Sequence, residues 1–191
     1  MKVLNNNLSA TQLKSVWTKI YQDWLDRKVD FTNLTIPSFY NRSKHFAVIV
    51  AQGTTMNELV TAIKKRFNVN LYTKDLDALV KINDRIADKD YVVIFNISIE
   101  ADKNLKNLSA DKLAEMNISG ITLLERLFLE IFYFDQLGEN LDINNWTLCS
   151  GSRDYGGVPG VHRNLDGSIT VAYFNPSYHS NIISSRAVVT Q

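Results

Sequence analysis

Apolar and polar residues alternate in short runs near the C-terminal end of this 191-residue chain. Such alternation is typical of strands with one buried and one exposed face, and it predicts strands at 146–149, 158–163, 168–174 and 184–189. Gly, Pro, Asn and Asp separate the runs. The pair Asp166-Gly167 predicts a hairpin turn, because glycine adopts positive φ without a steric penalty. The last quarter of the chain is therefore predicted to form a small antiparallel sheet.

Helical periodicity appears in the earlier parts of the chain. Apolar residues at three- and four-residue spacing predict a helix at about 10–27, short helices opening at Thr55, Thr73 and Ser109, and a long helix from Thr122 to near Gly138. Three of these starts have the capping-box spacing, at Ser9/Gln12, Thr55/Glu58 and Thr122/Glu125. We expect the apolar stripe of the long helix, which includes Leu127 and Ile131, to pack beneath the terminal sheet.

Two apolar runs rich in β-branched residues predict buried strands at 45–50 and 91–99, and the second is expected at the centre of the sheet. The irregular stretch 30–44 is the softest boundary in the chain. The predicted organisation is an N-terminal helical extension at 1–44 and a main domain at 45–191. The predicted class is α+β, with a small antiparallel C-terminal sheet packed on helices.

Composition narrows the possible partners. The chain is 45% hydrophobic and 21% charged, which is typical of a globular protein, and its formal net charge is +1. A balanced charge provides no overall field for nucleic acid or an anionic membrane, so neither is an expected partner. The N-terminal residues lack a signal-peptide core, and no apolar run reaches the length of a membrane span. A cytoplasmic location is therefore expected.

Residues with catalytic or metal-binding potential are few. The only cysteine, Cys149, cannot form an internal disulfide, and its place in an apolar strand predicts a buried thiol. The three histidines lack metal-ligand spacing, so no metal or other cofactor is predicted. Gly151, Gly156 and Gly157 lie outside any phosphate-binding motif and are interpreted as turn residues. Paired helical carboxylates, such as Glu125 and Glu130, are expected on polar faces.

Polar and aromatic residues lie among the terminal strands and suggest a displayed binding face. Tyrosine provides a large contact area at low entropic cost, and Asn and His provide adaptable hydrogen bonds. The hypothesis is a non-enzymatic recognition protein whose ligand is another protein. Its candidate ligand-binding residues are Arg153, Asp154, Tyr155, His162, Arg163, Tyr173, Asn175, Tyr178, His179 and Asn181. Val161, Ile169, Val171, Ala187 and Val189 are expected to hold the sheet together.

The segment GITLLERLFLEIFYFDQLGENLDINNWTLCSGSRDYGGVP, with VAYFNP and SSRAVV after it, resembles a family of uncharacterised bacterial proteins. The order of elements is also similar to a C-type-lectin-like fold, including the variable proteins of diversity-generating retroelements. That resemblance implies variable positions on the exposed face of the terminal sheet. Adenine-directed mutagenesis of Asn codons yields chiefly Asn, Tyr, Asp, His and Ser, which are the residue types found there.

The resemblance has limits. The calcium-site tripeptides of sugar-binding C-type lectins are absent, and so is the cysteine pair of formylglycine-generating enzymes. Neither calcium-dependent sugar binding nor that oxidase chemistry is therefore expected.

The charged Arg186 in the last predicted strand is expected to pair with a carboxylate.

Two other functions remain open from the sequence. One is an enzyme with a pocket between the long helix and the sheet, using Cys149, His162 or Arg153. The other is a structural component of an assembly that associates through aromatic residues of the first helix, although core packing is the favoured interpretation of those residues. They are Trp17, Tyr21 and Trp24.

Overall fold

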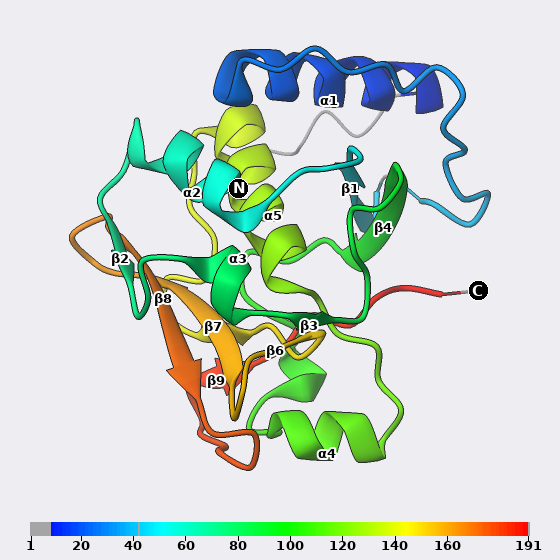
Figure 1. Cartoon of the computed structure of the whole chain (residues 1–191). Helices are drawn as coiled ribbons and strands as arrows, with labels where there is room; N and C mark the ends of the chain where they lie inside the picture. Colours follow the sequence, from blue (N-terminus) through cyan, green and yellow to red (C-terminus); the bar gives the residue numbers. More distant parts are fainter. Residues whose placement is uncertain (1–8, 42, 191) are drawn as a thin grey trace.

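The computed structural model describes residues 9–41 and 43–190, and it has the α+β class that the sequence predicts (Figure 1). Most of the segment considered for a signal peptide, residues 1–8, lies outside this range. The helices are α1 (Ala10–Leu25), α2 (Met56–Lys64), α3 (Leu76–Leu79), α4 (Ala110–Glu115) and α5 (Leu123–Leu137), with a 3₁₀ turn at Lys103–Leu105. The strands are β1 (His45–Val50), β2 (Val69–Leu71), β3 (Ile82–Asn83), β4 (Tyr91–Asn96), β5 (Trp146–Leu148), β6 (Ser152–Arg153), β7 (Val158–Arg163), β8 (Ile169–Phe174) and β9 (Ile183–Ser184).

Local sequence signals set the helix ends. All three predicted capping boxes form, at the starts of α1, α2 and α5. The long helix α5 stops at Gly138, whose φ of 67° is the left-handed conformation that commonly ends a helix. The start of α3 differs from its prediction, since Asp75 caps this four-residue helix in place of Thr73. The Asp75 carboxylate reaches the backbone of Ala78, whereas Thr73 bonds only the amide of Asp75.

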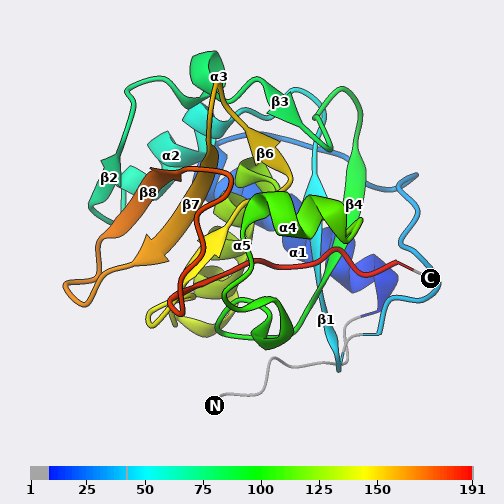
Figure 2. The same ribbon diagram turned by 90° about the horizontal axis from the view of Figure 1, so that it is seen from below.

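The main sheet has five strands in the order β2-β8-β7-β5-β9. Its centre is the predicted antiparallel hairpin of β7 and β8, whose turn includes Gly167 at a φ of 81°. The sheet is nevertheless mixed, because β2 runs parallel to β8 and β9 runs parallel to β5. Its inner face packs on α5 and its outer face is partly covered by α4 and the C-terminal segment (Figures 1 and 2).

Two strand predictions need correction. Strand β4 does not lie at the centre of the main sheet, because it ends at Asn96 and pairs along its length only with β1. Its apolar composition reflects burial in the core beside β1. The predicted strand at 184–189 is also shorter, since β9 ends at Ser184 and later residues form only isolated bridges, Ala187 to Gly120 and Val188 to Phe95. The terminal segment thus crosses from the main sheet to the β1–β4 pair.

The first helix is part of the core. Trp17, Tyr21 and Trp24 are almost completely buried, as the core interpretation predicted, and the Trp17 ring stacks on Phe132 of α5 at 5.2 Å. The suggestion that these residues form an association surface is therefore wrong. The domain boundary near residue 44 stays a prediction.

Within residues 9–41 and 43–190, no helix has both the length and the apolar composition needed to cross a bilayer.

A buried ion cluster lies between α5 and the main sheet, and its members are Arg126, Glu130, Asp142, Arg163 and Arg186. Asp142 binds Arg126 at 2.8 Å and Arg186 at 2.7 Å, which confirms the predicted carboxylate partner of Arg186. Burial alone would raise the pKa of Asp142, but Arg186 and then Arg126 outweigh it and hold that pKa below its usual value.

Glu125 and Glu130 are not on polar faces, and that prediction is wrong. Both are buried, and each has an arginine partner: Arg85 binds both oxygens of Glu125, while Arg126 binds Glu130 at 2.9 Å. Carboxylates can occupy such positions when a cation and hydrogen bonds replace their lost solvation. The sequence showed the acids on their helix but not the arginines that meet them.

Candidate functional site

The hairpin register sorts the candidate ligand-binding residues by face. His162 lies opposite Thr170 and points with it to the outer face, whereas Val161 lies opposite Val171 and both are buried on the inner face. The predicted sheet-holding residues Val161, Ile169 and Val171 are thus confirmed as core. Ala187 and Val189 are only half-buried, because they lie beyond the last regular strand.

The turn between β6 and β7 presents Tyr155 to solvent. Asp154 fixes this turn by accepting hydrogen bonds from the amides of Gly156 at 3.1 Å and Gly157 at 2.7 Å. Its other oxygen accepts from the Tyr72 hydroxyl at 3.3 Å. Tyr155, between Asp154 and Gly156, is 87% exposed. The turn therefore holds one large aromatic side chain outward on a backbone that is already ordered.

Tyr173 lies beside this turn although its strand position points inward. At the end of β8 its ring packs over Gly157, so closely that a Cβ built on that glycine would meet the ring at 1.9 Å. The ring also lies 6.0 Å from that of Tyr72, and its hydroxyl donates to the carbonyl of Gly156 at 3.4 Å. Tyr173 is 48% exposed, so one side of the ring remains available.

A row of aromatic rings follows the outer face. His162 stacks on Trp146 with centroids 5.0 Å apart, Trp146 meets Phe174 edge-on at 5.2 Å, and Phe174 stacks on Tyr178 at 5.9 Å. Trp146 and Phe174 also pack against a small apolar cluster that includes Val158 and Ile183. We call these four rings, Trp146, His162, Phe174 and Tyr178, the outer row.

The segment after β8 carries the remaining candidates. The side chain of Asn175 accepts from the amide of Ser177 at 3.0 Å, and its carbonyl accepts from the amide of Tyr178 at 2.9 Å. His179 lies 3.2 Å from the side-chain oxygen of Asn107, and Asn181 is exposed. This segment is thus a hydrogen-bonded turn that presents polar and aromatic side chains.

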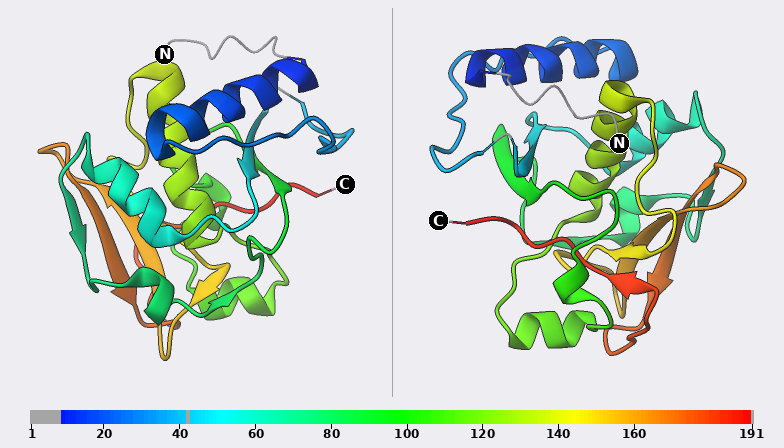
Figure 3. Two further views of the ribbon diagram at one scale, coloured as in Figure 1. Left: turned by 45° about the horizontal axis from the view of Figure 1, so that its top comes forward. Right: turned by 180° about the vertical axis from the view of Figure 1, so that it is seen from behind.

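Tyr155, Tyr173 and Tyr178 gather at one end of the β7–β8 hairpin, which we call the tyrosine end. Val158 pairs with Phe174 at this end, opposite the Asp166-Gly167 turn. Figures 1 and 3 show the β6–β7 turn and the segment after β8 at the same end of the molecule. Tyrosines from two separate parts of the sequence therefore lie at the same end of the sheet, with Tyr173 on its inner side and Tyr178 against Phe174 of the outer face.

Arg163 and Arg153 do not belong to an open display. Arg163 is 2% exposed, and its guanidinium lies 4.0 Å from the centre of the Phe67 ring and bonds Asn140, so the expectation that it is displayed is wrong. Its strand position is inward, next to Glu130. Arg153 is half-buried, and its guanidinium donates to the backbone carbonyls of Ser150 and Ser152.

The residues suggested for an enzyme do not meet. Cys149 is fully buried on the inner side, where burial raises the pKa of its thiol, whereas His162 lies on the outer face. The guanidinium of Arg153 is engaged with backbone carbonyls. Over residues 9–41 and 43–190, no group of three or more His, Cys, Asp or Glu side chains is arranged to hold a metal ion.

Sequence reasoning missed three aromatic residues beside the candidates, namely Tyr72, Trp146 and Phe174. Trp146 and Phe174 share the outward parity of His162, so strand alternation was a usable signal once the register was known. No local signal identified Tyr72, which follows β2 and reaches Asp154 only because β2 joins the sheet edge beside β8.

Comparison with known protein families, with curated proteins and with solved structures finds no match. The function of this chain is therefore inferred from its own geometry.

Proposed function

We propose that this protein is a non-enzymatic recognition protein that binds another protein through its tyrosine end and the adjacent outer row. The observation that carries the proposal is the exposure of Tyr155 at 87%, and of Tyr173 and Tyr178 at 48% each, at one end of the β7–β8 hairpin. Tyrosine side chains are enriched among residues that dominate binding energy, because they combine a large apolar area with a polar tip.

The order of the supporting turns favours this function. Asp154 and Asn175 each bond the backbone of their own turn, so little conformational freedom is left to lose when a ligand binds. Beneath them, the inner residues of the sheet are buried against α5. Binding residues on loops that a rigid scaffold supports are a common arrangement in recognition proteins.

Within the observed α+β class, we further propose a C-type-lectin-like arrangement. Its support is the closing terminal segment, which pairs with β5 and carries the buried Arg186. We also propose that a retroelement diversifies the display. Asp154, Tyr155, His162, Asn175, Tyr178, His179 and Asn181 have residue types that adenine-directed mutagenesis produces, and all are exposed or half-exposed. A near-identical template repeat and a reverse transcriptase beside the gene are expected; their absence from the flanking DNA would reject the diversification.

Binding by the tyrosine end can be tested with peptides selected on the protein from a random dodecapeptide library displayed on phage. Tyr155→Ala and Tyr178→Ala are expected to weaken binding of the recovered peptides, with at least one variant losing about 2 kcal/mol, or roughly 30-fold. Leu165→Ala is the matched control, because Leu165 is 94% exposed at the opposite end of the hairpin.

The control should bind like the unchanged protein, and all three variants should keep its melting temperature. Recovered peptides that bind the two tyrosine variants and the control equally well would reject the proposed binding surface.

A further inference from the structure

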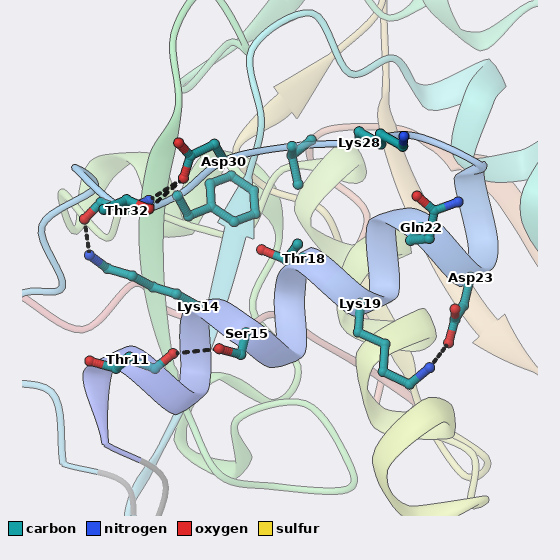
Figure 4. Close-up of a pocket in the computed structure, with 12 residues that line it drawn as sticks. Thr11, Lys14, Ser15, Thr18, Lys19, Gln22, Asp23, Lys28, Asp30 and Thr32 are labelled. Carbon is teal, nitrogen blue, oxygen red and sulfur yellow. Dashed lines mark hydrogen bonds and ion pairs between the residues drawn. The ribbon is translucent and has the colours of Figure 1, made fainter.

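A groove of about 750 Å³ separates the exposed side of α1 from the chain that runs back beside it at 28–32 (Figure 4). This volume is in the range of known ligand pockets. Thr11, Ser15, Thr18 and Gln22 line the helix side with hydroxyl and amide groups, and the half-buried Val29 contributes apolar surface from the returning chain. Figure 1 shows α1, which lines the groove, at the top of the molecule, and the β6–β7 turn and the segment after β8 at the bottom, so the groove and the tyrosine end are separate regions.

The returning chain has the character of a strand without a partner. Exposure alternates along it, with Lys28 and Asp30 exposed, Val29 half-buried and Phe31 buried, as in a strand that covers a core on one face. Hydrogen bonds flank it, from the Arg27 amide to Tyr21 and from the Leu34 amide to Phe31.

Between those flanking bonds, the backbone N–H and C=O groups of residues 28–30 make no hydrogen bond within the described chain. Unpaired backbone groups along an extended segment are a template for pairing with another chain. One edge of this segment borders the groove, so a second extended chain has both the space and the hydrogen-bonding groups it needs there.

The charges around the groove indicate whether its ligand is acidic or basic. Lys14 donates to the Thr32 carbonyl at 2.8 Å, and Lys19 pairs with Asp23 at 2.5 Å. Asp30 accepts from the amide of Thr32 at 2.8 Å. Lys28 has no polar partner among residues 9–41 and 43–190, and with three lysines and two aspartates in its lining the groove carries a net positive charge.

We propose that this groove binds an extended acidic peptide segment, which adds as a strand to residues 28–31 and places a carboxylate against Lys28. Strand addition obtains its affinity from main-chain hydrogen bonds and its specificity from alternate side chains. The half-buried Val29 provides apolar surface for those side chains, and Thr18 and Gln22 face the opposite edge of the peptide from α1.

The test uses a random dodecapeptide library selected on the Tyr155→Ala/Tyr178→Ala protein, so that the tyrosine end does not capture the peptides. Successive residues of an extended chain direct their amides to opposite edges, so Val29→Pro and Asp30→Pro remove donors from opposite sides. Only one of them should weaken binding, by at least tenfold. Asp30→Ala controls for loss of the carboxylate, and Lys28→Glu should weaken binding of the acidic peptides about tenfold.

A second measurement tests strand addition even if a proline variant unfolds. Peptides N-methylated at successive positions should lose at least tenfold in affinity at alternate positions only. The strand-addition proposal is overturned if no peptide depends on Lys28, if both proline variants bind normally, or if N-methylation has no alternating effect. Such a result would not bear on the proposed binding at the tyrosine end, because the protein used for selection already lacks the side chains of Tyr155 and Tyr178.

Discussion

Among single residues, Asp142 shows how this core accommodates charge. It is fully buried and accepts hydrogen bonds from Arg126, Arg186 and Thr147, so its carboxylate joins α5, β5 and the terminal segment. A buried ion pair contributes little net stability compared with apolar residues, but removing one partner leaves an unpaired charge in the core. Asp142 is therefore a position where a change of a single atom should have a large effect.

Asp142→Asn should lower the free energy of unfolding at pH 7 by about 3–5 kcal/mol, because two buried guanidinium groups lose their shared carboxylate. The pKa of Asp142 is depressed in the folded state, so its contribution is present above the ordinary aspartate pKa of about 3.9 and is lost as pH falls toward the folded value. Urea unfolding of both proteins between pH 7 and pH 3 measures this. The difference between them should shrink below about pH 4; a difference that stays constant with pH would contradict the assignment.

Gly157 tests the close contact at the tyrosine end. Gly157→Ala should cost about 1–3 kcal/mol, because the new methyl group would occupy the position of the Tyr173 ring. In the Tyr173→Ala background the same substitution should be nearly neutral, and chemical unfolding of the four proteins of this cycle measures the difference. Equal costs in both backgrounds would show that the ring does not rest on this glycine.

At the scale of elements, α5 is the centre of the packing. It contacts α1, α2, β1 and β7, and eleven of its fifteen residues, Leu123 through Tyr133, are buried. Its burial all around the first three turns explains why two glutamates and an arginine on it need partners inside the protein.

Leu127→Ala and Ile131→Ala should each lower the free energy of unfolding by roughly 2–5 kcal/mol, because both side chains are buried and their removal leaves cavities. Met116→Ala is the matched control, since Met116 is 48% exposed and its truncation should change stability by less than about 0.5 kcal/mol. Losses below that value for both α5 variants, measured by urea unfolding, would show that these two side chains are not packed in the core.

Elements with local signals were predictable from the sequence. The boxes at Ser9, Thr55 and Thr122 fixed three helix starts, and Asp166-Gly167 located the hairpin between β7 and β8. These signals depend on hydrogen bonds or backbone angles within a few residues, so they do not require knowledge of the fold.

Features that depend on distant contacts were not predictable. The composition of β4 indicated burial but not that its partner strand would be β1. Arg163 had the appearance of a displayed residue until the register placed it inward beside Glu130. Tyr72 reaches the candidate surface through the pairing of β2 with β8, which joins segments about a hundred residues apart.

At the scale of the whole molecule, the structure separates what holds the fold from what is exposed. The inner sheet face, α5 and the buried ion cluster form the scaffold. Tyr155, Tyr178 and His179 lie outside it on turns. Replacing exposed side chains of this kind with alanine is expected to change stability by no more than about 0.5 kcal/mol while weakening ligand binding.

The central claim, that ligands bind at the tyrosine end, is tested most directly by amide hydrogen exchange with and without a saturating peptide selected on the unchanged protein. The bound peptide should slow exchange in residues 154–157 and 175–182, while the Asp166-Gly167 turn at the other end of the hairpin should exchange as before. Exchange that is unchanged in both of these segments, whether or not it is slowed elsewhere in the chain, would contradict the proposed surface.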